Sequence, residues 1–198
     1  MLLPQSDQRE TRRYSVTNAV DVAAFITGAL KLPLCDTEKL QTLVYFSQAW
    51  ALAWTGKPLF ADDFQAWPDG PVAPAVYRVQ KYETSRLHEP SNLSADEADI
   101  VTAVVEFYGP LSSTDLVDLT HEHSPWRDAR AGQAPDAPSH VKVSPDGMRT
   151  FYARQAILSA DGPVRRGRVS QVSDVDAHRL GQRASSDWAE GLALLADA

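Results

Sequence analysis

The sequence predicts a mostly α-helical protein, a compact multi-helix domain built around one central buried helix. Segments with apolar residues at helical spacing alternate with short breaks rich in Gly, Pro, Ser and Asp. No run shows the sustained alternation of a long β-strand, so at most a short β-hairpin is expected near residues 59–72. The segment 36–55 is apolar around nearly its whole circumference, which is typical of a helix at the centre of a core.

Composition and charge narrow the class of protein. Of the 198 residues, 43% are hydrophobic and 23% are charged, which is ordinary for a globular chain with one core. The formal net charge of -7 disfavours broad binding to DNA or RNA. No basic and then apolar leader is visible, and no apolar run approaches the roughly 18 residues of a membrane span. The single cysteine, Cys35, is expected to be a small buried residue in a cytoplasmic, reducing compartment.

The chain divides into three parts by its patterning. Residues 1–14 are polar, charged and without an apolar period, so a flexible N-terminal tail is expected. Residues 15–158 carry the strong helical patterns and are expected to form the folded domain. In the C-terminal extension, 159–198, a terminal helix capped by Ser185 or Ser186 is expected. Its apolar positions at helical spacing are Trp188, Leu192 and Leu195.

The first two helices are predicted from spacing and end signals. Apolar residues recur at helical spacing over residues 20–30, which predicts the first helix. The central helix can be capped by Asp36 or Thr37, and Gly56 suits the left-handed turn beyond its end. The patterning assigns two tryptophans of this helix to the core, Trp50 and Trp54.

Two further helices follow the proline-rich stretch. Pro74 suits the first turn of a helix, where its missing N–H leaves no hydrogen bond unmade. Ser94 and Glu97 have the spacing of a capping box, in which each side chain accepts from a backbone N–H of the other residue. The helix that they begin is expected to end at the Gly109-Pro110 pair.

The last two helices of the folded domain are separated by a loop. Ser112 or Ser113 can cap a short helix that carries Leu116 and Leu119. Residues 129–140 are rich in Pro, Ala and Gly and are predicted to be a loop. The Ser-Pro-Asp sequence at 144–146 then supplies a cap, a first-turn proline and a first-turn carboxylate, which predicts the final helix.

No motif indicates a particular enzyme or cofactor. His121 and His123 lie two residues apart and would point to nearly opposite sides of a helix, so they do not share a metal ion by themselves. A helix C-terminus capped by one His is the favoured interpretation. A metal-dependent enzyme using Thr120, His121 and His123 is kept as the least favoured function, and neither a metal nor a cofactor is expected.

The stretch 64–77, FQAWPDGPVAPAVY, predicts a rigid corner. Trp67 is expected to dock on the central helix, and residues 69–70 are expected to make a turn. Pro71 and Pro74 restrict the backbone that follows. A rigid corner also lowers the ordering cost of binding, so a structural role and a binding role both remain open. For three aromatic residues, a place in the core and a place in a binding interface likewise both remain possible: Trp67, Tyr77 and Trp126.

The segment KLQTLVYFSQAWALAWTGKPLFADDFQAWPDGPVAPAVYRVQKY resembles the Panacea domain, a phage-associated family. The matching residues are Lys39, Leu40, Gln41, Tyr45, Trp50, Gly56, Pro58, Leu59, Phe60, Ala66, Trp67, Gly70, Pro71, Val72, Pro74, Val76 and Tyr77. Further matches lie at Val22-Ala23, Ile26, Thr120-His121 and Pro125-Trp126. The similarity identifies residues 15–158 as a Panacea-like helical domain. Thr42 and Pro68-Asp69 depart from the usual family pattern, beside a turn where partner specificity can change.

The resemblance implies an antitoxin of a toxin–antitoxin system that neutralises a cognate toxin by direct protein–protein binding. It also implies that the toxin is encoded by an adjacent gene and that the antitoxin is not an enzyme. The alternative is a proteolytic adaptor that delivers the toxin to a cellular protease. A homo-oligomer is compatible with the pattern. The candidates for toxin binding are Lys39, Trp67, Asp69, Tyr77, Arg78, Lys81, His121 and Trp126.

Overall fold

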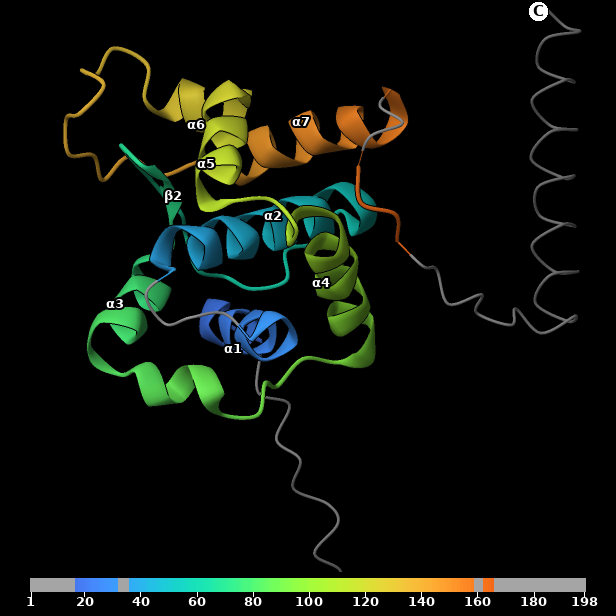
Figure 1. Cartoon of the computed structure of the whole chain (residues 1–198). Helices are drawn as coiled ribbons and strands as arrows, with labels where there is room; N and C mark the ends of the chain where they lie inside the picture. Colours follow the sequence, from blue (N-terminus) through green and yellow to red (C-terminus); the bar gives the residue numbers. More distant parts are fainter. Residues whose placement is uncertain (1–16, 32–35, 159–161, 166–198) are drawn as a thin grey trace, which may run out of the picture. The chain divides into compact units, whose positions relative to one another are not determined.

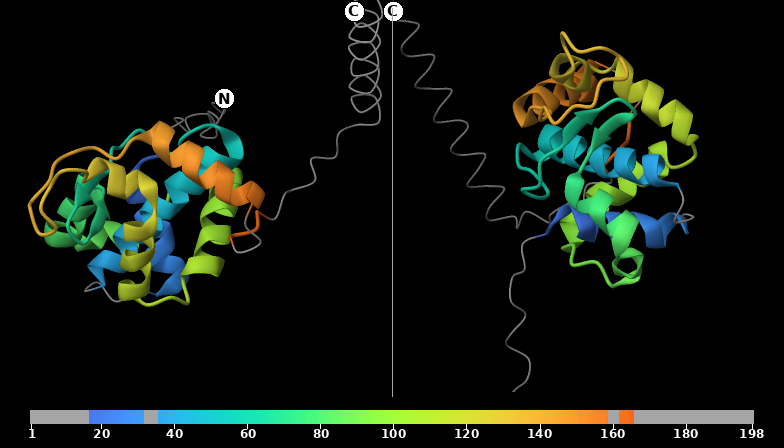
Figure 2. Two further views of the ribbon diagram at one scale, coloured as in Figure 1. Left: turned by 90° about the horizontal axis from the view of Figure 1, so that it is seen from above. Right: turned by 90° about the vertical axis from the view of Figure 1, so that its left-hand side faces the viewer.

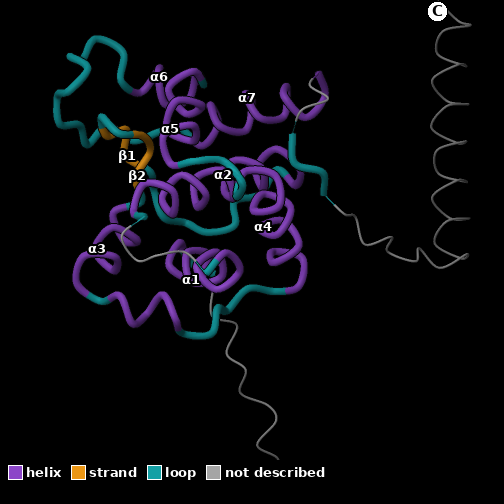
Figure 3. Tube along the Cα trace, viewed as in Figure 1, coloured by secondary structure: helices purple, strands orange, loops and turns teal. Residues whose placement is uncertain are grey.

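The computed structural model describes residues 17–31, 36–158 and 162–165 (Figure 1). In chain order the elements are α1 (Ala19–Leu30), α2 (Thr37–Thr55), β1 (Gln65–Trp67), β2 (Gly70–Val72), α3 (Pro74–Tyr82), the 3-10 helix η1 (Thr84–His88), α4 (Ala95–Tyr108), α5 (Ser113–Glu122), α6 (Ser124–Ala129) and α7 (Pro145–Leu158). These residues are mostly helical, and their two strands form the short hairpin that the sequence predicts (Figure 3). No helix among them is long and apolar enough to cross a bilayer. The predicted N-terminal tail, Cys35 and the predicted terminal helix lie outside the described residues.

Helix α2 is the centre of the core. Every residue from Leu40 to Leu52 is buried, as the apolar circumference of this segment predicts. In Figures 1 and 2, α1 and α3 lie on one side of α2, and α5, α6 and α7 lie on the other. Helix α4 also packs against α2. The helix begins at the Asp36 cap and ends at Gly56, whose positive φ of 69° closes the last turn.

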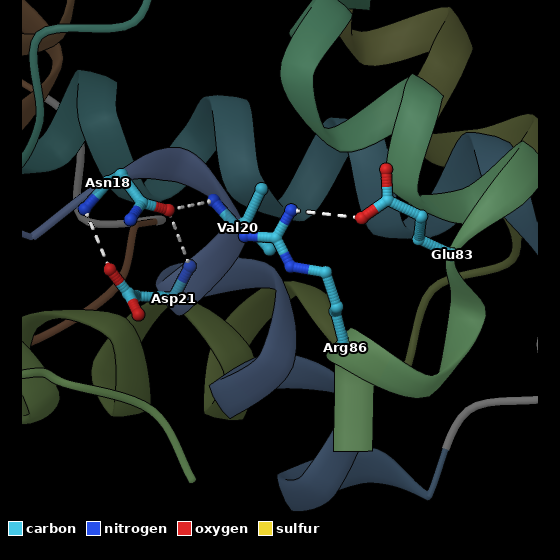
Figure 4. Close-up of polar contacts among 5 residues, drawn as sticks. All are labelled: Asn18, Val20, Asp21, Glu83 and Arg86. Carbon is cyan, nitrogen blue, oxygen red and sulfur yellow. Dashed lines mark hydrogen bonds and ion pairs between the residues drawn. The ribbon is translucent and has the colours of Figure 1, made fainter. Parts of the chain in front are cut away.

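Capping boxes begin three of the outer helices. Ser94 and Glu97 form the predicted box at the start of α4, and at α5 the structure selects Ser112 rather than Ser113. Asn18 and Asp21 form a third box: the Asn18 side chain accepts from the N–H groups of Val20 and Asp21, and the Asp21 carboxylate accepts from the Asn18 N–H (Figure 4). In these three helices the first turn is therefore stabilised locally, before any tertiary contact is made.

Two buried glutamines on α2 hold the segment that leads into and out of the hairpin. The Gln48 amide donates to the Phe60 carbonyl at 2.9 Å and accepts from the Leu59 N–H at 2.8 Å. The Gln41 carbonyl oxygen accepts from the Ala73 N–H at 2.9 Å. Gln41 and Gln48 are seven residues apart, close to two helical turns, so they lie on one face of α2. The connection that carries the hairpin is consequently attached to the central helix at both ends.

Candidate functional site

The hairpin packs against α5 through a glycine. Strands β1 and β2 are antiparallel, with Trp67 paired to Gly70 across the turn. Gly70 has a φ of 117°, which side-chain-bearing residues rarely adopt. A Cβ added there would also lie 3.4 Å from the Thr120 hydroxyl oxygen of α5. Glycine at this position therefore allows both the turn and its contact with α5.

Two aromatic rings frame a hollow beside the turn. Trp67 and Tyr77 meet edge to face, with ring centroids 5.0 Å apart, and both are half-buried. They wall a hollow of about 260 Å³ that is closed on its inner side by the N-terminal turns of α2. Its other lining residues are Thr37, Glu38, Gln41, Thr42, Asp69, Pro71 and Val72. Trp67 thus shares this hollow with the first turns of the central helix, and part of its surface stays accessible.

Helices α5 and α6 add a second aromatic pair next to the turn. The His121 ring stacks on Trp126 with 3.9 Å between centroids, and the Trp126 indole N–H donates to the Trp67 carbonyl at 3.0 Å. Burial lowers the pKa of His121, opposed by the Pro68 carbonyl and by nearby carboxylates, one of them that of Asp69. The His121 ring is therefore mainly neutral at pH 7, when it stacks as an uncharged aromatic group.

Arg130 contacts both strand β1 and the Trp126 ring. This role was not anticipated from the sequence. Its guanidinium group is buried and donates to the carbonyls of Ala66, Ala134, Pro135 and Ala137. It also lies 5.5 Å from the Trp126 ring centroid. In the described ranges no carboxylate forms an ion pair with it. Arg130 therefore links the loop 131–140 to strand β1 and to the aromatic pair.

The remaining candidates lie on other faces. The Lys81 ammonium lies 5.7 Å from the Tyr77 ring centroid and 5.3 Å from that of Tyr82, so it borders the aromatic pair. Arg78 is exposed and lines a separate hollow near the start of α1. Lys39 donates to the Leu111 carbonyl at 2.7 Å and so ties α2 to the connection between α4 and α5.

Five of the eight sequence candidates therefore gather around the turn. We call this group, Trp67, Asp69, Tyr77, His121 and Trp126, the hairpin surface. Lys81 lies at its edge, whereas Arg78 and Lys39 lie apart from it. The interactions that hold the surface in place, made by Gln41 and Arg130, join residues 32 and 64 positions apart in sequence. The local spacing of residues in the sequence does not indicate contacts between positions so far apart in the chain.

The two histidines considered as metal ligands have different surroundings. His121 stacks on Trp126, whereas the His123 Nδ1 atom lies 2.9 Å from the Tyr152 hydroxyl. Burial lowers the pKa of His123 to about 4. Its backbone ends α5, and its imidazole reaches α7 instead of capping the helix with its side chain. Within the described part of the chain, no three His, Cys, Asp or Glu side chains are grouped so that they could hold a metal ion.

Comparison with known proteins defines the family. Residues 40–127, which run from the first turn of α2 through the hairpin and into α6, match the family described as antitoxin SocA-like, Panacea domain. Antitoxin SocA of Caulobacter vibrioides (strain NA1000 / CB15N) is 30% identical over 141 residues, which cover 63% of this chain and 72% of the relative. The chain therefore belongs to the SocA-like, Panacea-domain antitoxin family, which confirms the resemblance found in the sequence. No solved structure matches.

Proposed function

We propose that this protein neutralises a cognate toxin by binding it directly through the hairpin surface. Membership of an antitoxin family supports a toxin as the partner. The observation that carries the choice of surface is the pair formed by Trp67 and Tyr77, half-buried rings that wall a hollow on the outside of the core. Partly exposed aromatic rings beside a pocket are the usual centres of binding energy at protein interfaces.

The hairpin surface is held rigid before any partner arrives. Gln41 fixes one end of the hairpin connection, the glycine at 70 allows close contact with α5, and Arg130 fixes β1. Little backbone ordering is then needed on binding, which leaves more of the contact energy for affinity. The carboxylates of Glu38 and Asp69 line the hollow beside the aromatic rings. An arginine of the toxin fits this combination, since its stem is apolar and its head is cationic.

The test uses the toxin encoded by the adjacent gene, produced together with this protein. The Asp69→Lys and Tyr77→Ala changes are expected to weaken the complex by about tenfold or more each and to reduce growth rescue. Asp136→Lys makes the same change of charge at an exposed loop position and is the matched control. Circular dichroism spectra must show that all three variants are folded.

Two results would overturn the proposal. The first is full activity of the purified toxin in the presence of excess wild-type protein. The second is undiminished toxin binding by a folded Asp69→Lys/Tyr77→Ala double variant. Toxin half-life in cells, measured in parallel, separates direct inhibition from delivery to a protease, because direct inhibition leaves the half-life unchanged.

A further inference from the structure

A second hollow lies on another part of the molecule. It has a volume of about 490 Å³ and is bounded by α4, α5 and α7 above the C-terminal half of α2. We call it the α4–α5 groove. It shares no lining residue with the hollow beside Trp67. On α2 the nearest lining residues of the two hollows, Thr42 and Trp50, are eight positions apart, which corresponds to about 12 Å along the helix axis.

The floor of the α4–α5 groove is aromatic, and its polar atoms are already used. The Trp50 indole N–H donates to the Tyr108 hydroxyl at 3.2 Å, and the Tyr152 hydroxyl lies 2.9 Å from His123. Each of these polar groups is therefore paired with another side chain of the protein and not with a ligand. Phe107 forms part of the wall, and 39% of its surface is exposed. The groove consequently offers a mainly apolar surface to anything that enters it.

One edge of the groove carries a line of negative charge. Asp115, Asp118 and Glu122 have i, i+3 and i+7 spacing on α5, so their side chains lie along one face of that helix. Hydrogen bonds from Ser112 lower the pKa of Asp115, which keeps it charged at neutral pH. In the part of the chain that the structure describes, no Lys or Arg forms an ion pair with Asp118 or Glu122. Both carboxylates are exposed and available to a partner.

We propose that the α4–α5 groove docks a basic amphipathic helix of a partner protein. Its apolar side chains would rest on the aromatic floor, and its Lys or Arg side chains would follow the acidic face of α5. The charge complementarity selects this occupant, because a basic helix can form ion pairs with the Asp118 and Glu122 carboxylates, whereas an acidic or uncharged helix cannot. This second docking surface is separate from the hairpin surface, and it does not depend on the identity of the toxin.

The experiment measures binding of designed peptides to the full-length protein. The probe is a fluorescein-labelled helical peptide of about 16 residues with Leu and Phe on one face and Lys along one edge. A second peptide carries Glu in place of each Lys. Fluorescence anisotropy at low salt is expected to show at least about tenfold tighter binding of the Lys peptide, and added salt is expected to weaken it.

Matched variants assign the binding to the groove. The Asp118→Lys/Glu122→Lys variant is expected to bind the Lys peptide at least about tenfold more weakly. Asp128→Lys/Asp136→Lys changes the net charge by the same amount at exposed positions elsewhere and should alter binding by less than about threefold. Phe107→Ser removes the exposed part of the apolar wall and should weaken binding at high salt, where the ionic contribution is screened.

Several results would overturn the groove proposal. Equal binding of the Lys and Glu peptides is one, and equal losses in the two charge-reversal variants is another. A wild-type dimer that dissociates when Asp118 and Glu122 are reversed, measured by sedimentation, would assign the groove to a second copy of this chain. Trp67→Ala separates the two proposals, because it should impair toxin neutralisation and leave peptide binding intact. Loss of peptide binding in a folded Trp67→Ala variant would contradict the claim that the hairpin surface and the α4–α5 groove bind independently.

Discussion

Two buried tyrosines of the core have different hydrogen-bonding states. Tyr45 is fully buried, and its hydroxyl has no hydrogen bond of regular geometry to any described residue. Tyr152 is equally buried, but its hydroxyl is bonded to His123. Burial raises the pKa of both hydroxyls above their usual range, so both stay protonated.

These tyrosines therefore respond differently to loss of the hydroxyl. Tyr152→Phe leaves His123 without its partner and should lower the free energy of unfolding by about 1–2 kcal/mol. Tyr45→Phe removes a poorly paired group and should be neutral or stabilising, within about 1 kcal/mol. Urea unfolding of both variants at pH 7 measures the difference. A larger loss for Tyr45→Phe than for Tyr152→Phe would contradict the hydrogen-bond assignment.

His123 makes stability depend on pH. In the unfolded chain its imidazole takes up a proton near pH 6.5, whereas in the folded protein burial delays this until about pH 4. The unfolded state binds more protons between these values, so stability falls as the pH is lowered through this window. After allowance for partial solvent screening, His123 changes the free energy of unfolding across this window by on the order of 2 kcal/mol. Unfolding of His123→Asn and wild type from pH 7 to 4 should show a smaller pH dependence in the variant.

At the scale of elements, Arg130 connects the loop 131–140 to strand β1. Arg130→Ala leaves several inward-facing carbonyls without a donor and should cost about 2–3 kcal/mol of stability. Arg130→Lys should recover only part of this, because an ammonium cannot reproduce the planar set of donors. Hydrogen exchange should increase in 131–140 and in β1, and unchanged exchange in both segments would show that the loop is held by other contacts.

The hairpin turn makes a separate prediction with an internal control. Gly70→Ala places a side chain at a φ of 117° against Thr120 and should destabilise the protein by about 1–3 kcal/mol. Gly28 lies in helix α1 with no atom within 4 Å of an added Cβ. Gly28→Ala should therefore stabilise by about 0.5–1 kcal/mol. Thermal unfolding of both variants tests whether the backbone angle at the glycine, rather than the loss of glycine in general, decides whether the substitution stabilises or destabilises the protein.

For the whole molecule, the packing of most of the described helices against α2 predicts one cooperative unit. Leu43 is completely buried on this helix, and Leu43→Ala should cost about 2–5 kcal/mol. Ile157 is 81% exposed on α7, and Ile157→Ala should change stability by less than about 0.5 kcal/mol. Near-ultraviolet and far-ultraviolet circular dichroism should report one shared transition for the described domain. Separate transitions would mean that some helices unfold without disturbing α2.

The parts of this architecture that depend on local patterns could be predicted from the sequence. Helix periodicity located the central helix, and the capping box at Ser94 located the start of α4. The short helix α6 was not predicted, because its six residues are too few to show a helical period, although Pro125 suits a first turn. The roles of Gln48 and Arg130 were also missed, because their partners are chosen by folding rather than by position in the chain. The aromatic residues of the hairpin surface could be named from the sequence, whereas the contacts that hold them in place could not.

The enclosure of α2 has a consequence for how the protein is made. The apolar surface of α2 is covered partly by α7, which begins about 90 residues after α2 ends. A ribosome adding roughly 5–20 residues per second needs on the order of 5–20 seconds to supply that cover. During this interval the nascent chain presents an incompletely covered hydrophobic helix to its surroundings. Because chaperone binding and degradation of the incomplete chain compete with folding, we expect slower translation to lower the yield of folded protein.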